Sequence, residues 1–260
     1  MNKQIPEFYV NNFLQPSSNY CLCIPIINEG QKIIQQLKEI NEQRLDEIID
    51  IFICDGGSTD GSTNLDLLQS LHVNTLLVKQ GPGKLSTQLR MGFFWALEKG
   101  YKGIITMDGN NKDSVSSIPL FIDGLDQGFD FLQGSRFIKG GQGINTPIIR
   151  FLALRIIHVP IISFVAKFKF TDTTNGFRAY SRFYLTHPEV QPFRDIFNTY
   201  ELLAYLSVRA SQLGLKVKEI PVIRSYPKTG KIPTKISILK GNLLLLKILL
   251  NTLLGKYNPT

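Results

Sequence analysis

The chain has 260 residues, of which 43% are hydrophobic and 19% are charged, and its formal net charge is +8. This composition excludes an intrinsically disordered chain, and the length allows one large domain or two small ones. The three cysteines, Cys21, Cys23 and Cys54, form no C-x-x-C pair, and we interpret them as buried, reduced thiols.

Strand and helix patterns alternate through the first half of the chain. The predicted strands are 20–26, 50–54, 73–79, 103–107 and 129–132, and the predicted helices are 31–43, 59–71, 85–99 and 114–125. We expect Ser58 or Asp60 to cap the helix at 59–71. Strands that alternate with helices at this spacing pair in parallel through right-handed crossovers, so the sequence predicts an α/β fold with a mostly parallel central sheet.

The second half has a different pattern. Residues 146–170 are apolar and basic and are interrupted by Pro160, and residues 236–254 predict an amphipathic helix. Between them we predict a strand at 176–182, a helix at 199–213 and a strand at 216–223. No uninterrupted apolar run reaches the roughly 18 residues of a spanning helix, and the polar first twenty residues do not resemble a secretory signal.

Positive charge is concentrated in two segments without Asp or Glu, residues 131–171 and 220–260. A basic face on an otherwise acidic body favours an anionic partner. Both segments are also rich in Ile, Leu and Phe, which indicates an anionic membrane surface and not a nucleic acid.

Two acidic loops directly follow predicted strands. Residues 55–61 read D-G-G-S-T-D-G, and Asp108 follows the strand at 103–107. Ligands of parallel sheets bind at the carboxyl ends of the strands. A nucleotide-sugar site needs carboxylates, glycines that let backbone approach phosphate, and positive charge for the departing diphosphate. Taken alone, each loop is equally compatible with a turn and a helix cap.

The order of the motifs is more specific. P-I-I-N-E at 25–29 ends the first strand, G-P-G-K at 81–84 precedes a helix, and G-S-R-F at 134–137 follows the fifth strand. This order resembles the family-two glycosyltransferases of the GT-A fold, in particular the dolichol-phosphate mannose synthase and polyprenyl-phosphate glycosyltransferase branch. D-T-T-N-G-F-R-A at 172–179 is similar to that branch's D-x-x-S-G-F-R-A segment, and E-I-P-V at 219–222 to its E-[IV]-P-[VI] strand.

The resemblance implies a Rossmann-like GT-A domain and an inverting transfer of one sugar from a nucleotide diphosphate-sugar to a polyprenyl (dolichol-type) phosphate. The expected domains are an N-terminal extension at 1–19, the catalytic domain at 20–225, and a basic loop with an amphipathic membrane-interface helix at 226–260. We expect a cytoplasmic protein, peripheral on the cytoplasmic face of a membrane, with a membrane-protein partner or a second copy as further partners.

The resemblance also implies roles for individual residues. The expected catalytic residues are Asp108, Arg136 and Asp172. The expected nucleotide-sugar site comprises Pro25, Asn28, Glu29, Asp55, Gly57, Ser58, Gly83, Lys84, Asp108 and Gly109, and the acceptor phosphate site comprises Ser135, Arg136, Arg150, Lys228 and Lys231. The acceptor phosphate is already an anion, so the protein mainly aligns the reactants and compensates charge.

The chain departs from the family pattern at three positions. The usual Asp-Asp of the second loop is Asp55-Gly56, and the loop at 228–235 lacks the family's arginine. The D-x-D metal motif reads D-G-N, and Lys112, two residues further on, cannot bind a cation. We predict that Asp108, Asn110 and Asp113 together hold Mg²⁺ or Mn²⁺. The alternative is that Lys112 itself neutralises the diphosphate and the metal is weakly bound or absent.

Two other functions stay open at this point. The first is a related transferase with a soluble or glycan acceptor, in which the basic and apolar segments form an oligomer interface. The second is a non-catalytic nucleotide-sugar binding module, for which the neutral Asn110 in place of a carboxylate is the motive.

Overall fold

The computed structural model describes residues 3–227 and 238–259. The predicted acceptor residues Lys228 and Lys231 lie outside these ranges. The strands are β1 Phe8–Asn12, β2 Tyr20–Ile26, β3 Asp50–Asp55, β4 Thr75–Lys79, β5 Gly103–Thr106, β6 Phe131–Ser135, β7 Gln142–Ile144, β8 Arg178–Ser181, β9 Val217–Pro221 and β10 Ile223–Ser225. The helices are α1 Gln31–Glu42, α2 Leu65–Ser70, α3 Leu85–Glu98, α4 Ile118–Asp126, α5 Ile148–Ala153, α6 Val159–Ala166, α7 Arg182–Thr186, α8 Glu201–Gln212 and α9 Ile238–Leu253.

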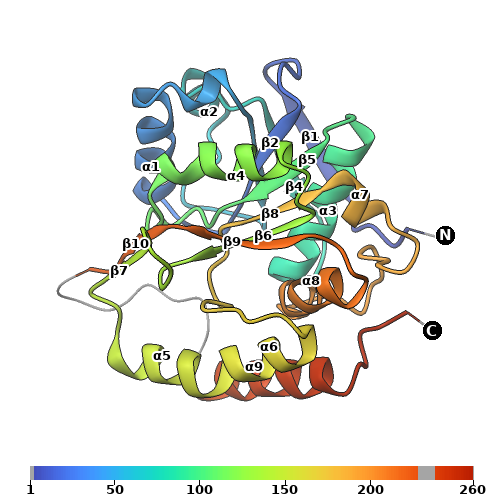
Figure 1. Cartoon of the computed structure of the whole chain (residues 1–260). Helices are drawn as coiled ribbons and strands as arrows, with labels where there is room; N and C mark the ends of the chain where they lie inside the picture. Colours follow the sequence, from blue (N-terminus) through green and yellow to red (C-terminus); the bar gives the residue numbers. More distant parts are fainter. Residues whose placement is uncertain (1–2, 228–237, 260) are drawn as a thin grey trace.

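An eight-stranded sheet forms the centre of the molecule, in the order β1-β4-β3-β2-β5-β8-β6-β9 (Figure 1). Strands β4, β3, β2 and β5 are parallel, β8 is antiparallel between β5 and β6, and β6 is parallel to β9. A small second sheet pairs β10 with β7 in parallel. The prediction of a mostly parallel α/β fold is therefore confirmed.

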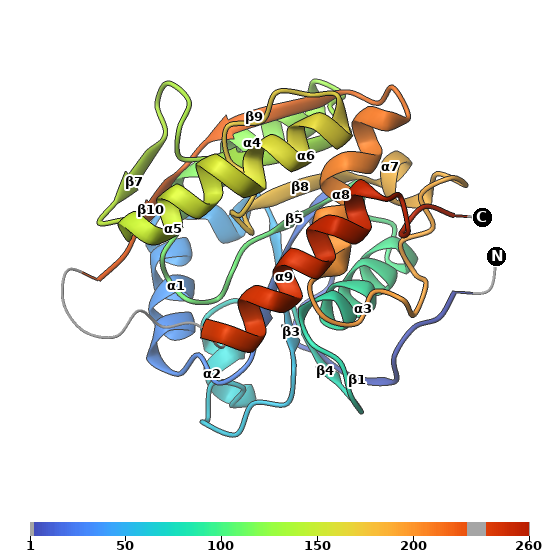
Figure 2. The same cartoon turned by 90° about the horizontal axis from the view of Figure 1, so that it is seen from below.

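The sheet is covered on both faces. Successive side chains of a strand point to opposite faces, and in this sheet both sets are apolar. In β2, Cys21 and Cys23 belong to one apolar cluster, whereas Leu22 and Ile24 belong to the other. Helices α1, α2 and α4 cover the second face; α3, α7 and α8 cover the first, and α6 and α9 pack against α8 (Figures 1 and 2). The cysteines are buried free thiols, as expected.

Two local predictions in the first half are corrected. The helix predicted at 59–71 is reduced to α2, whose cap is Asn64: its Oδ1 accepts the Leu67 N–H at 2.9 Å. Ser58 and Asp60 cannot serve as caps because their side chains bind within the loop, to Asp55 and Ser62 respectively. Residues 8–12, for which no strand was expected, form β1 and pair antiparallel with β4 at the sheet edge.

The segment around Pro160 forms one continuous helix, Ile148–Ala166, in place of two interrupted pieces. A π-helical turn at Leu154–His158 directly precedes α6, and Pro160 lies in the first turn of α6. A proline lacks an N–H and is tolerated where the hydrogen-bond ladder already changes. By length and composition alone, this helix of 19 residues with mean hydropathy 2.0 could cross a membrane. Only 17% of that window is buried, unlike a core helix, which is mostly buried.

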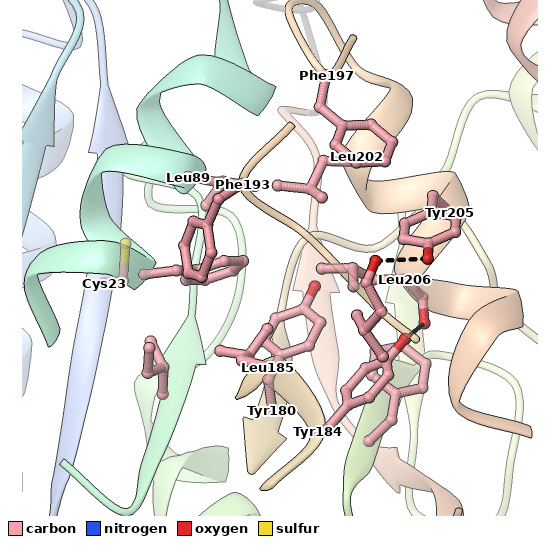
Figure 3. Close-up of a cluster of buried hydrophobic side chains, with 14 of the residues drawn as sticks. Cys23, Leu89, Tyr180, Tyr184, Leu185, Phe193, Phe197, Leu202, Tyr205 and Leu206 are labelled. Carbon is pink, nitrogen blue, oxygen red and sulfur yellow. Dashed lines mark hydrogen bonds between the residues drawn. The ribbon is translucent and has the colours of Figure 1, made fainter. Parts of the chain in front are cut away.

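Buried tyrosines organise the core between β8 and α8 (Figure 3). The Tyr184 hydroxyl donates to the Leu206 carbonyl at 2.6 Å, and the Tyr205 hydroxyl donates to the Val190 carbonyl at 2.6 Å. Each ring thus buries its apolar area while its hydroxyl keeps a partner, as a buried phenol requires. These bonds connect α7 and the segment before α8 to α8 itself.

We expect Tyr184→Phe to lower the free energy of unfolding by about 1 kcal/mol, because one buried hydrogen bond is lost while the ring remains. Urea denaturation followed by circular dichroism measures the change. The matched control is Tyr9→Phe, since Tyr9 is 66% exposed and should change stability by less than about 0.5 kcal/mol. Equal effects of the two substitutions would contradict this account of the core.

Candidate functional site

The first loop of the site follows β3 and is shaped by Asp55. The carboxylate of Asp55 accepts the N–H of Gly57 at 2.9 Å, the N–H of Ser58 at 3.0 Å and the Ser58 hydroxyl at 2.5 Å. Gly57 has φ +100°, a backbone conformation that glycine adopts without strain. Asp55 is only 2% exposed, so in this structure its carboxylate orders the loop.

The loop after β2 is joined to this one. The Asn28 Oδ1 accepts the N–H of Thr59 at 2.8 Å, and the Asn28 N–H donates to the Ser58 hydroxyl at 2.9 Å. Both loops leave the carboxyl ends of parallel neighbours, with Ile26 opposite Asp55. The predicted nucleotide residues Asn28, Asp55 and Ser58 are therefore brought together.

A glycine at position 56 explains one departure from the family pattern. The Gln88 Nε2 donates to the carbonyls of Ile26 and Cys54 at 2.7 and 2.8 Å. A Cβ at Gly56 would lie 3.0 Å from that Nε2 atom. A side chain at position 56, such as the usual second aspartate, would therefore crowd the glutamine that ties β2 to β3.

Gly83 and Lys84 lie between β4 and α3, on the other side of β3. The Lys84 N–H donates to the Asn198 carbonyl at 2.7 Å. Gly83 has φ +104°, and a Cβ there would lie 2.2 Å from the Thr87 Oγ1. The glycine therefore lets the chain turn closely into α3, and the Lys84 ammonium lies 6.0 Å from the centre of the Tyr200 ring.

The second loop, after β5, is joined to β10 by an arginine that the sequence analysis had not singled out. The Arg224 Nη2 donates to the Asp108 Oδ2 at 3.0 Å, and its Nη1 donates to the Asp113 Oδ2. Backbone bonds hold the same segments together: the Ser114 N–H donates to the Ile223 carbonyl at 2.9 Å, and the Ser225 N–H to the Lys112 carbonyl at 2.8 Å.

Asp113 does not present the free carboxylate that the metal prediction required. Its Oδ2 is bound by Arg224, its Oδ1 accepts the Asn175 Nδ2 at 3.1 Å, and the residue is 3% exposed. Burial raises the pKa of Asp113 to about 6, and the nearby Arg224 opposes this shift. The assignment of Asp113 as a metal ligand is therefore withdrawn, because both of its oxygens bind protein groups.

Asp108 and Asn110 remain as oxygen donors for a cation. The Asp108 side chain is 29% exposed, and the Asn110 Oδ1 is buried without a hydrogen-bond partner among the described residues. The Asn110 Nδ2 donates to the Asp108 Oδ2 at 3.4 Å, so the orphaned Oδ1 would share a cation with Asp108 only after the amide rotates. Within residues 3–227 and 238–259, however, no cluster of three or more Asp, Glu, His or Cys side chains could hold a metal ion.

Arg136 and Asp172, both predicted as catalytic, form a buried ion pair. The Arg136 Nε donates to the Asp172 Oδ2 at 2.6 Å, and its Nη2 donates to the Asp172 Oδ1 at 2.9 Å. Glu219 on β9 fixes the backbone of Asp172, because its carboxylate accepts the Asp172 N–H at 3.0 Å. Because both Asp172 oxygens bind Arg136, the carboxylate orients that arginine and is poorly placed to act as a base.

Tyr226, which the sequence analysis also missed, gathers four cationic side chains. Its hydroxyl accepts the Arg136 Nη1 at 3.1 Å. The Lys112 ammonium lies 5.6 Å from the ring centre, and the guanidinium carbons of Arg150 and Arg224 lie at 5.7 and 5.8 Å. Such distances are typical of cation–π contacts. Burial raises the pKa of Tyr226, but the three arginines outweigh it and the net shift is downward.

The site therefore combines two parts at one edge of the sheet. Glycine-containing loops after β2, β3 and β4 form one part, and the cationic cluster around Tyr226 forms the other. The segment from Asp172 to Gly176 runs between the Arg136 side chain and Asp108. At its end, a Cβ at Gly176 would lie 2.4 Å from the Asp108 Oδ1. The arrangement suits a ligand that carries several phosphate charges.

The sequence and the fold are similar to those of known glycosyltransferases. The family model described as "Glycosyl transferase family 2" matches residues 21–187. The chain is 26% identical to polyprenol monophosphomannose synthase of Mycolicibacterium smegmatis over 84% of this chain and 81% of that protein. It is 25% identical to undecaprenyl-phosphate mannosyltransferase of Micrococcus luteus over 76% of this chain and 80% of that protein.

The fold is similar to that of glucosyl-3-phosphoglycerate synthase from Mycobacterium tuberculosis, solved in complex with Mn²⁺, uridine-diphosphate-glucose and phosphoglyceric acid. The TM-score is 0.65 at 12% identity, with 92% of this chain and 79% of that chain covered. Identity this low supports the GT-A fold alone. The matched family model, which spans more than half of the sequence, shows that the chain belongs to glycosyl transferase family 2 and is a glycosyltransferase.

Proposed function

We propose that this enzyme transfers one sugar from a nucleotide diphosphate-sugar to a polyprenyl phosphate at a membrane surface, with inversion at the anomeric carbon. One observation carries the proposal. Arg150, on the exposed apolar helix Ile148–Ala166, and Arg136 both contact Tyr226, which also contacts Lys112 of the loop after β5. A phosphate anchored in a membrane is the substrate that needs basic groups on such a helix.

In the proposed reaction, an oxygen of the acceptor phosphate forms a bond to the anomeric carbon as the bond from that carbon to the diphosphate breaks. The electron pair leaves with the nucleoside diphosphate, and no proton has to be removed from the acceptor. Two arginines would compensate the charge of the acceptor phosphate: Arg136, which Asp172 orients, and Arg150. Ser135 directly precedes Arg136 at the end of β6. The protein contributes alignment and positive charge.

For the donor, we propose that Pro25, Asn28, Glu29 and the 55–58 loop hold the base and ribose, with Gly83 and Lys84 beside them. Gly109, also assigned to the donor, lets the loop after β5 pack closely on β2, since a Cβ there would lie 2.5 Å from the Ile26 side chain. A divalent cation bound with the donor would be held by Asp108 and the Asn110 Oδ1. Mg²⁺ commonly uses one or two carboxylates and takes its other ligands from substrate phosphates and water. Its charge would stabilise the departing diphosphate.

The proposed membrane surface consists of one side of the helix Ile148–Ala166 and of α9, which lie together below the sheet (Figures 1 and 2). Large apolar side chains are exposed there, at 38–84% of their area: Ile148, Ile149, Phe151, Leu152, Ile156, Ile157, Phe164, Leu243, Leu246, Leu250, Leu253 and Leu254. A patch of this kind, with arginines on the same helix, is typical of proteins that lie in the interface of an anionic bilayer. We propose a peripheral position on the cytoplasmic face.

The direct test is to incubate the enzyme with a labelled nucleotide-sugar and a polyprenyl phosphate in detergent micelles. We expect label to enter the organic phase. Arg150→Gln should raise KM for the lipid phosphate at least about tenfold, because a charge-assisted hydrogen bond contributes about 1.5–3 kcal/mol. Nucleotide affinity should be unchanged.

The matched control is Arg44→Gln, which removes an exposed arginine that forms a surface ion pair with Glu47. It should leave KM for the lipid unchanged. Label that remains in the aqueous phase, on a soluble acceptor, would refute the lipid acceptor while leaving the transferase activity intact.

A second prediction concerns the apolar surface. The double substitution Ile149→Ser with Ile156→Ser should weaken binding to phosphatidylglycerol vesicles at least about tenfold, because each isoleucine contributes about 1.5–3 kcal/mol when removed from water. Flotation of the enzyme with these vesicles at low salt measures the bound fraction. The control, Leu65→Ser with Leu120→Ser, changes exposed leucines on α2 and α4, above the sheet (Figure 1). Equal binding by both double variants would contradict the proposed membrane face.

A further inference from the structure

Two cationic groups, one in the loop after β5 and one in β10, lie beside the position where the family places metal ligands. Lys112 follows Asn110 by two residues and is 7% exposed, and Arg224 is 6% exposed. Both lie over the Tyr226 ring, and Arg224 bonds directly to Asp108. Positive charge is therefore built into the protein on the side of Asp108 that faces Tyr226.

This loop is held from two directions. The Asn111 N–H donates to the Gln36 Oε1 at 2.9 Å, and the Lys112 carbonyl accepts the Ser225 N–H at 2.8 Å. Asn111 itself has φ +52°. The backbone is fixed on both sides of Lys112 and its side chain is buried against the Tyr226 ring, so the ammonium is kept in this part of the site.

The charges of this cluster already balance without a metal ion. Asp108 and Asp113 carry two negative charges, and Arg224 and Lys112 carry two positive ones. Because the two cations already offset the two carboxylates, an added dication would leave this cluster with a double positive charge of its own.

We propose that Lys112 and Arg224 form a cationic pair that binds the diphosphate of the donor, so that nucleotide binding by this enzyme depends little on a divalent cation. The inference rests on the proposed function, because it assumes a nucleoside diphosphate in this site. The negative charge of the diphosphate would be compensated mainly by these two side chains. A cation at Asp108 and Asn110 would add little to nucleotide affinity.

Isothermal titration calorimetry of the full chain with UDP, GDP, ADP and CDP tests this, in EDTA and in Mn²⁺. For the nucleotide that binds, we expect the wild-type Kd in EDTA to be within about tenfold of the Kd in Mn²⁺. Lys112→Gln removes the charge and supplies an amide oxygen. This variant should bind the nucleotide at least about tenfold more weakly than the wild type in EDTA, because a charge-assisted hydrogen bond is lost. In Mn²⁺ its Kd should return toward the wild-type value.

The matched control is Lys102→Gln, the same substitution at an exposed lysine before β5, at the opposite end of that strand. It should leave both values unchanged. Arg224→Gln is combined with Asp113→Asn, so that no buried carboxylate loses its partner, and it should shift binding in the same direction as Lys112→Gln. Asp113→Asn alone is its reference.

The outcomes separate the two proposals. Wild-type binding in Mn²⁺ but not in EDTA would overturn this inference and leave the proposed function standing. The same holds if Lys112→Gln behaves like Lys102→Gln. Absence of binding for every nucleotide in both buffers would overturn the proposed function, and the inference with it.

Discussion

The bridge from Arg224 to Asp108 and Asp113 is the interaction on which the arrangement of the site depends. A buried guanidinium is tolerated only when it is paired, and here it has two carboxylates and the Asn175 Oδ1 as partners. It fixes the loop after β5 to β10. Strand β10 pairs with β7, which directly precedes the helix that carries Arg150. One side chain thus relates the donor loops to the helix proposed for the acceptor.

The layers of this fold follow from local sequence patterns, and the exceptions have physical causes. Short continuous apolar runs predicted β2, β3 and β5 with ends within two residues, because strands buried on both faces consist almost entirely of apolar residues. Strand β1 was missed because its residues alternate little: Tyr9 and Val10 are both exposed at the sheet edge. The helix at 59–71 was predicted too long because Ser58 and Asp60 bond within their own loop, which leaves Asn64 as the cap.

The site was predictable where its residues lie in a loop directly after a strand, and unpredictable where it depends on long-range pairing. The positions of Asp55 and Asp108 follow from strand ends, and Arg136 from the G-S-R-F motif. Arg224 lies 111 residues from Asp113, and no local pattern connects them. The sequence shows an arginine next to an apolar strand, and such a residue is equally typical of an ordinary charged surface position. Asp113 was misassigned for the same reason, since its partner was invisible in the sequence.

A crystal structure of the enzyme with its nucleoside diphosphate, grown in EDTA, tests the central claim most directly. The account predicts diphosphate oxygens within about 3.2 Å of the Lys112 Nζ and of the Arg224 guanidinium, with the bond from Arg224 to Asp113 retained. It would be contradicted by a diphosphate that binds away from both cations. It would equally be contradicted if crystals hold nucleotide only when Mn²⁺ is added, with the cation on Asp108 and Asn110 and the Lys112 side chain turned away.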